Sequence, residues 1–115
     1  MTEYTVEREL WGEKIVAHCQ AAAGGINVFL WGGQQPHIGG ISVLSPDGRT
    51  HTISFPGHKD AVLTEQWAEA FRDVGILPAV ITAGIHYDNL SRDEIVTVTH
   101  LTDDLLAQVL TFLNR

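Results

Sequence analysis

Three short stretches of this 115-residue chain combine histidine with glycine or with charged residues, and such residues bind ligands and transfer protons. They read Gly-Gly-Gln-Gln-Pro-His-Ile-Gly-Gly at 32–40, Gly-His-Lys-Asp at 57–60 and Gly-Ile-His-Tyr-Asp-Asn at 84–89. Imidazole and carboxylate groups together can coordinate zinc, iron or manganese, and a carboxylate beside an imidazole can orient the ring. We therefore treat these three stretches as the candidate site.

The first stretch, 32–40, follows an expected strand and contains four glycines. Glycine allows positive φ angles and a close backbone approach, which a loop wrapped around a ligand requires. A flexible hairpin loop whose glycines serve turns explains the same composition. The candidate binding residues in this stretch are Gly32, Gly33, Pro36, His37 and Gly39.

The second stretch places His58, Lys59 and Asp60 directly before a helix expected to begin near Ala61. The unpaired amides and the dipole of a helix N-terminus attract anions, and Lys59 adds a cation. This stretch is therefore a candidate phosphate site. For Asp60 the plainer interpretation is that it caps the helix.

The third stretch follows a short buried strand, where the backbone is rigid yet open to a ligand. His86 and Asp88 lie two residues apart, so a continuing strand puts both on one side, where the carboxylate can orient the imidazole. A turn over 87–90, in which Asp88 bonds its own backbone, is the alternative.

None of the three stretches matches a standard signature such as Gly-x-Gly-x-x-Gly, a Walker loop or His-Glu-x-x-His. The histidines could join Asp60 and Asp88 in a metal site, with His37, His58 and His86 as candidate ligands. Their spacing alone does not show that they meet. No serine lies in a nucleophile-elbow context, so a Ser-His-Asp triad is poorly supported.

The composition argues against several functional classes. Fourteen acids against seven Lys and Arg give a net charge of -7, which disfavours nucleic-acid binding through a basic face and docking on anionic lipid. No apolar run approaches the roughly 20 residues that span a bilayer, and the acidic N-terminus is unlike a signal peptide. The lone Cys19 excludes an intramolecular disulfide framework and a cysteine-rich zinc site. We expect one acidic, cytoplasmic domain over 1–115.

The elements that position the three stretches are strands in the first half and mainly helices in the second. Apolar alternation and turn residues predict strands over 14–20, 26–31, 41–44 and 51–55, and the short apolar run 78–85 predicts a buried strand. The first four strands form two hairpins, the second around the turn Ser-Pro-Asp-Gly.

An apolar stripe predicts a helix over 61–74 that ends at Gly75, and the capping-box spacing of Ser91 and Glu94 opens a second helix. The β-branched run 95–99 makes the continuity of that second helix doubtful. The element order predicts an α+β fold, a two-layer sandwich with a mostly antiparallel sheet of five to six strands and two main helices on one face.

At the three stretches the sequence resembles the prenylated-flavin chaperone family, the LpdD-like domain. The resemblance rests on Gly-Gly-x-x-Pro-His-Ile-Gly at 32–39, His-Lys-Asp at 58–60 and Gly-Ile-His-x-Asp at 84–88. That family is associated with gallate-type decarboxylases of the UbiD type, which use prenylated FMN. The resemblance implies a non-catalytic module that binds prenylated FMN, or FMN, and assists its delivery to, or maturation in, a UbiD-type decarboxylase.

The same resemblance implies roles for individual residues. Lys59 and the following helix start would take the phosphate, the glycine loop would lie against the cofactor, and Trp31 and Tyr87 could stack on the flavin rings. The implied cofactor-binding residues are Gly32, Gly33, Pro36, His37, Gly39, His58, Lys59, Asp60, His86 and Asp88.

Two other functions fit the same residues. One is a small metal-dependent hydrolase or lyase that uses the histidines and aspartates, and the other is an accessory subunit that binds only its protein partner. In either case we expect a homo-oligomer, because a sheet built from hairpins leaves edge strands that need covering.

Overall fold

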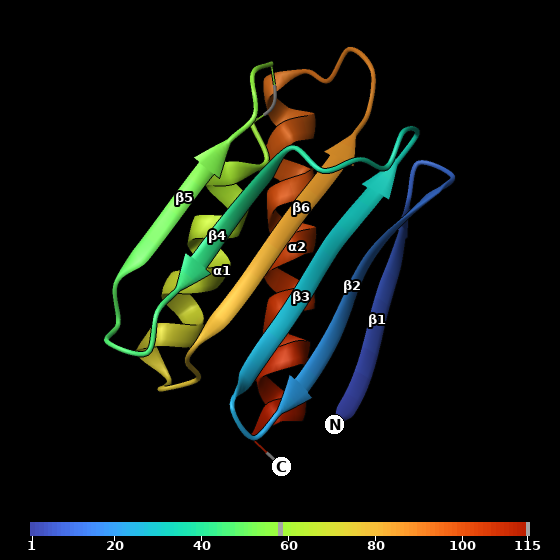
Figure 1. Cartoon of the computed structure of the whole chain (residues 1–115). Helices are drawn as coiled ribbons and strands as arrows, with labels where there is room; N and C mark the ends of the chain where they lie inside the picture. The colour runs from blue at the N-terminus through green and yellow to red at the C-terminus, as the bar shows by residue number, and fades with distance from the viewer. Residues whose placement is uncertain (58, 115) are drawn as a thin grey trace.

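The computed structural model describes residues 1–57 and 59–114, which form a six-stranded sheet and two helices. The elements are β1 (Thr2–Leu10), β2 (Glu13–Ala22), β3 (Gly25–Gly33), β4 (Gly40–Leu44), β5 (Thr50–Ser54), α1 (Ala61–Asp73), β6 (Ala79–His86) and α2 (Arg92–Leu113). The strand order is β1-β2-β3-β6-β4-β5, and every neighbouring pair is antiparallel except β3 with β6. Both helices cover the same face of the sheet (Figure 1), so the predicted α+β sandwich is confirmed.

The core lies between the sheet and the helices because apolar residues alternate along the strands. The two expected hairpins are confirmed, since β2 pairs with β3 and β4 pairs with β5. The largest fully buried side chains come from both layers: Ile15, Leu30, Leu44, Trp67, Phe71, Ile81 and Leu105.

The N-terminal strand β1 is an element that the apolar pattern does not indicate. Within Thr2–Leu10 only Val6 is buried, and the outer side carries Glu3 and Glu7. The strand is held to α2 by its inner side, where the ring of Tyr4 stacks on Phe112 with centroids 4.0 Å apart. It therefore extends the sheet and covers the end of α2.

The helix α2 is continuous, so the doubt about its β-branched run 95–99 is not borne out. It begins at the predicted capping box, in which the Glu94 amide donates to the Ser91 hydroxyl and the Glu94 carboxylate accepts from the Ser91 amide. Val98 is buried against the core, and this packing outweighs the weak helix propensity of its neighbours. In the described part of the chain, neither helix is long and apolar enough to cross a membrane.

One end of the sandwich collects the parts of the chain that carry the candidate residues. The strands β3, β5 and β6 end there, both helices begin there, and the turn between β1 and β2 lies at the same end (Figure 1). The topology thus brings together three stretches that are up to about fifty residues apart in the sequence.

The lone thiol, Cys19, is on the inner side of β2 and is buried. Burial raises its pKa to about 12, because the thiolate would lose its hydration. We expect Ellman's reagent at pH 8 to leave the folded protein unlabelled and to titrate one thiol after addition of guanidinium chloride. Rapid labelling without denaturant would contradict this burial.

Candidate functional site

The three stretches meet at the end of β6. The backbone amide of Gln34 donates to the carbonyl of His86 at 2.7 Å, and the amide of Gly39 donates to the carbonyl of Ala83 at 2.8 Å. The side-chain oxygen of Gln34 also accepts from the amide of Asp88 at 2.8 Å. The loop between β3 and β4 therefore follows β6 closely and is fixed at both of its ends.

Two glycines make this close approach possible. A side chain at Gly84 would overlap the carbonyl oxygen of His37, and one at Gly33, where φ is +81°, would overlap the carbonyl oxygen of His86. The glycines of this region thus allow backbone to pack on backbone. None of the predicted residues Gly32, Gly33, Pro36 and Gly39 lines the adjacent cavity. Gly32 and Gly33 end β3, and Pro36 and Gly39 belong to the loop that holds His37.

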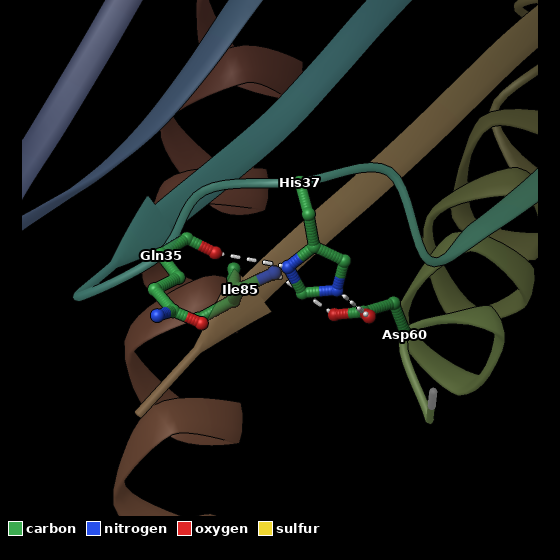
Figure 2. Close-up of polar contacts among 4 residues, drawn as sticks. All are labelled: Gln35, His37, Asp60 and Ile85. Atoms are coloured by element: carbon green, nitrogen blue, oxygen red, sulfur yellow. Dashed lines mark hydrogen bonds and ion pairs between the residues drawn. The ribbon is translucent and has the colours of Figure 1, made fainter. Parts of the chain in front are cut away.

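Asp60 is the centre of the polar contacts (Figure 2). Its Oδ2 lies 3.0 Å from Nε2 of His37, and its Oδ1 accepts the backbone amide of Ile85 at 3.0 Å. The side chain is only 7% exposed. Asp60 does occupy the N-cap position of α1, as predicted, but its side chain makes no capping hydrogen bond and instead joins the helix start to the loop and to β6.

The ring of His37 is held on two sides. Its Nδ1 lies 3.0 Å from the carbonyl oxygen of Gln35, and its Nε2 faces the Asp60 carboxylate. A carbonyl and a carboxylate only accept hydrogen bonds, so both contacts are satisfied when both ring nitrogens carry a proton. The two acceptors fix the orientation of the ring beside the cavity.

His86 and Asp88 form a second histidine–carboxylate pair, as the two-residue spacing predicts. Nε2 of His86 lies 2.8 Å from Oδ1 of Asp88, and both side chains are partly exposed. The rings of His37 and His86 are 6.2 Å apart between centroids. The two imidazoles are therefore close neighbours, one from the loop before β4 and the other from the end of β6.

A cavity of about 370 Å³ opens between these polar groups and the first turns of the two helices. Its lining residues are His37, Gly57, Lys59, Asp60, Val62, Leu63, Ile85, His86, Tyr87, Leu90, Ile95, Val98 and Thr99. Its polar side is formed by the predicted residues His37, Lys59, Asp60 and His86. Its apolar side is formed by α1, α2 and the segment between β6 and α2. The volume lies within the roughly 300–1,000 Å³ of small-molecule pockets.

Tyr87 closes the cavity towards the turn between β1 and β2. Its hydroxyl donates to the carbonyl of Leu10 at 2.9 Å, and its ring is nearly perpendicular to that of Trp11, with centroids 5.3 Å apart. Burial, and to a lesser degree the charge of Glu13, raise the Tyr87 pKa, so the phenol stays protonated as a donor. Trp31, the other predicted stacking residue, does not line the cavity; it lies beside Phe29 on β3.

Lys59 lines the cavity beside the start of α1. The amides of Val62, Leu63 and Thr64 donate to the carbonyls of Lys59 and Asp60, so the first turn already satisfies these donors. A phosphate at this helix start would therefore rely on the Lys59 ammonium and the helix dipole more than on those three amides.

The predicted metal ligands are only partly placed. His58 lies outside the described residues, and within 1–57 and 59–114 no group of three His, Cys, Asp or Glu side chains is placed to hold a metal ion. His37 and His86 are each bonded to a carboxylate of their own.

The apolar wall of the cavity is the part of the site that sequence reasoning missed. It is formed mainly by Val62 and Leu63 of α1 and by Ile95, Val98 and Thr99 of α2. A partial signal was present, because the run 95–99 carries apolar β-branched residues directly after a capping box, where a purely solvent-facing helix would be polar.

Fold and cavity together define a small α+β domain with a cavity of small-molecule size at one end of its sheet. A family model described as "Prenylated flavin chaperone LpdD-like domain" matches residues 9–114, and the chain belongs to this family. Protein LpdD of Lactiplantibacillus plantarum is 29% identical over 118 residues, which cover 98% of this chain and 85% of that protein. The resemblance seen in the three stretches is therefore confirmed at the level of the family.

The contacts of Asp60 predict a measurable contribution to stability. Asp60→Ala would remove the side-chain acceptor of the partly buried Ile85 amide and one of the acceptors that hold the His37 ring. We expect this to lower the free energy of unfolding by about 2 kcal/mol in urea denaturation. Asp73→Ala is the control, because Asp73 is exposed at the other end of α1 and pairs with Arg72 at 3.6 Å. That variant should stay within about 0.5 kcal/mol of the parent, and equal losses in both variants would contradict the role given to Asp60.

Proposed function

We propose that this chain is a non-catalytic chaperone that binds prenylated FMN and passes it to a UbiD-type decarboxylase in the cytoplasm. The observation that carries the proposal is the convergence of His37, Lys59 and His86 on one side of a cavity whose other side is apolar. Membership of the prenylated-flavin chaperone family supports the ligand class. Prenylated FMN supplies the decarboxylase with its reactive group, and this chain would only hold it.

The residues of the cavity fit a flavin mononucleotide in their chemistry. The isoalloxazine and its added prenyl carbons are largely apolar and suit the wall formed by Leu63, Ile95 and Val98. The phosphate suits Lys59, which is the only Lys or Arg among the described residues that line the cavity. The imidazole of His86, whose Nε2 faces Asp88, can offer its Nδ1 to a polar atom of the ring system or the ribityl chain. The ring of His37, whose two nitrogens face Gln35 and Asp60, would line the same side of the ligand.

The remaining predicted residues would act around the ligand. Gly32, Gly33, Pro36 and Gly39 would keep the loop against β6 so that His37 faces the cavity, and Asp88 would orient His86. Asp60 would orient His37. His58 remains a predicted ligand contact, and assembly into a homo-oligomer remains a prediction as well.

Native mass spectrometry of the protein with FMN, with riboflavin and with anaerobically prepared prenylated FMN tests the proposal. We expect one flavin per chain, with prenylated FMN retained best because of its larger apolar surface. If no flavin is retained at concentrations at which the protein stays folded, the proposed function is wrong.

A separate variant tests whether Lys59 binds the phosphate of the flavin. Lys59→Ala should weaken FMN and prenylated FMN binding about tenfold, because a charge-assisted contact is lost, and should leave riboflavin unchanged because it has no phosphate. Lys14→Ala is the matched control: Lys14 is the other lysine of the sequence and pairs with Glu7 on the sheet. An equal effect of Lys59→Ala on riboflavin would place the phosphate elsewhere.

A further inference from the structure

Large exposed apolar side chains gather at the end of the molecule that holds the cavity. Among the described residues, ten large hydrophobic side chains are exposed. Six of them belong to segments at this end, and we call these six the apolar rim: Trp11, Ile38, Phe55, Val62, Ile95 and Val96. They come from the β1–β2 turn, the loop before β4, the end of β5 and the first turns of both helices (Figure 1).

The apolar rim borders the cavity mouth. Val62 and Ile95 line the cavity and are still 59% and 47% exposed, so they stand where the cavity opens to solvent. Trp11 contacts the cavity residue Tyr87, and Ile38 directly follows His37. The amide of Phe55 donates to the carbonyl of Gly39 in the same loop, at 3.0 Å.

Apolar side chains exposed in this number at one end of a molecule are costly to leave in water, and exposed apolar surface marks places where another molecule binds. An occupant of this surface would cover the cavity mouth at the same time. Resting on the proposed function, we infer that the apolar rim is the docking surface for the apo-decarboxylase that receives the flavin, so that the two ligand sites face each other.

The position of the surface favours the acceptor enzyme over a second copy of this chain. A second copy seated on the rim would close the mouth through which the flavin must enter and leave. The charges point the same way. In the segments around the mouth the acids Glu13, Asp88, Asp93 and Glu94 outnumber the cations Lys14, Lys59 and Arg92, and the whole chain has a net charge of -7, so two copies would repel each other.

The acceptor, by contrast, has to bind the phosphate of the same cofactor and must therefore place cations in its own site. An enzyme entrance with Lys or Arg side chains complements the acidic surround of the rim. This complementarity steers encounter, so association should weaken as the salt concentration rises.

The test uses rim residues that do not line the cavity. Ile38→Ser and Val96→Ser remove exposed apolar surface from the rim, and Val74→Ser is the control. Val74 is matched to Val96 in residue type and in exposed fraction, 47% for each, but it follows the last turn of α1 at the opposite end. Each variant is loaded with prenylated FMN and mixed with a UbiD-type decarboxylase purified as apoprotein.

Three quantities are measured for each variant: flavin affinity, affinity for the apo-decarboxylase without flavin, and the rate at which decarboxylase activity appears. We expect flavin affinity within about twofold of the parent in all variants. In the two rim variants, affinity for the apo-decarboxylase and the transfer rate should fall about tenfold, which is the loss of one well-packed interface contact. Val74→Ser should match the parent in all three.

Other outcomes overturn the inference. Rim variants that bind the enzyme and transfer flavin like the parent would show that docking occurs elsewhere. A parent dimer that the rim substitutions dissociate, with no affinity for the decarboxylase, would make a second copy the occupant. Failure of the proposed function looks different: the parent would bind no flavin, while the affinity measurement without flavin would still decide where the enzyme docks.

Discussion

The candidate site depends on one buried carboxylate, that of Asp60. A buried charge is expensive unless polar partners replace its lost hydration, and Asp60 has two: the Ile85 amide and the His37 ring. These partners come from β6 and from the loop before β4, while Asp60 itself stands at the start of α1. Because one side chain satisfies both contacts, the three segments hold a fixed arrangement, and the cavity between them has a defined polar side.

The cavity itself follows from how tightly the loop is packed on β6. The loop runs antiparallel to the end of the strand and bonds to the backbone of Ala83 and His86. With any side chain at Gly84 the loop would be pushed away from β6, and the contact between His37 and Asp60 would be lost. The glycines therefore act on the ligand site at one remove, by setting the position of His37. This role of the glycines differs from both interpretations of the sequence, a flexible hairpin turn and a loop that wraps directly around a ligand.

The sequence predicts those parts of the fold whose signals are local. Alternation and turn residues suffice for the two hairpins, and the stripe and capping box suffice for both helices. The strand β1 is not predicted, because it has few buried residues and its outer side is charged. Its position in the sheet depends on pairing with β2. The role of Asp60 is not predicted for a related reason. Its local context indicates a helix cap, whereas its partners His37 and Ile85 lie 23 and 25 residues away in the sequence. The apolar wall likewise arises only when α1 and α2 come together across the sheet.

The distribution of polarity around the cavity fits the proposed function, in which the chain must release what it binds. A ligand held only by a deep apolar pocket would dissociate slowly, because all of its buried surface would have to return to water. Here the cavity is open at one end of the sandwich, and its apolar wall continues outwards through Val62 and Ile95 onto the exposed surface. A flavin in this site would therefore keep part of its surface within reach of a docking partner. Coverage of the mouth by that partner would exclude water during transfer, so the ligand could pass between two apolar surfaces without the full cost of hydrating its ring system.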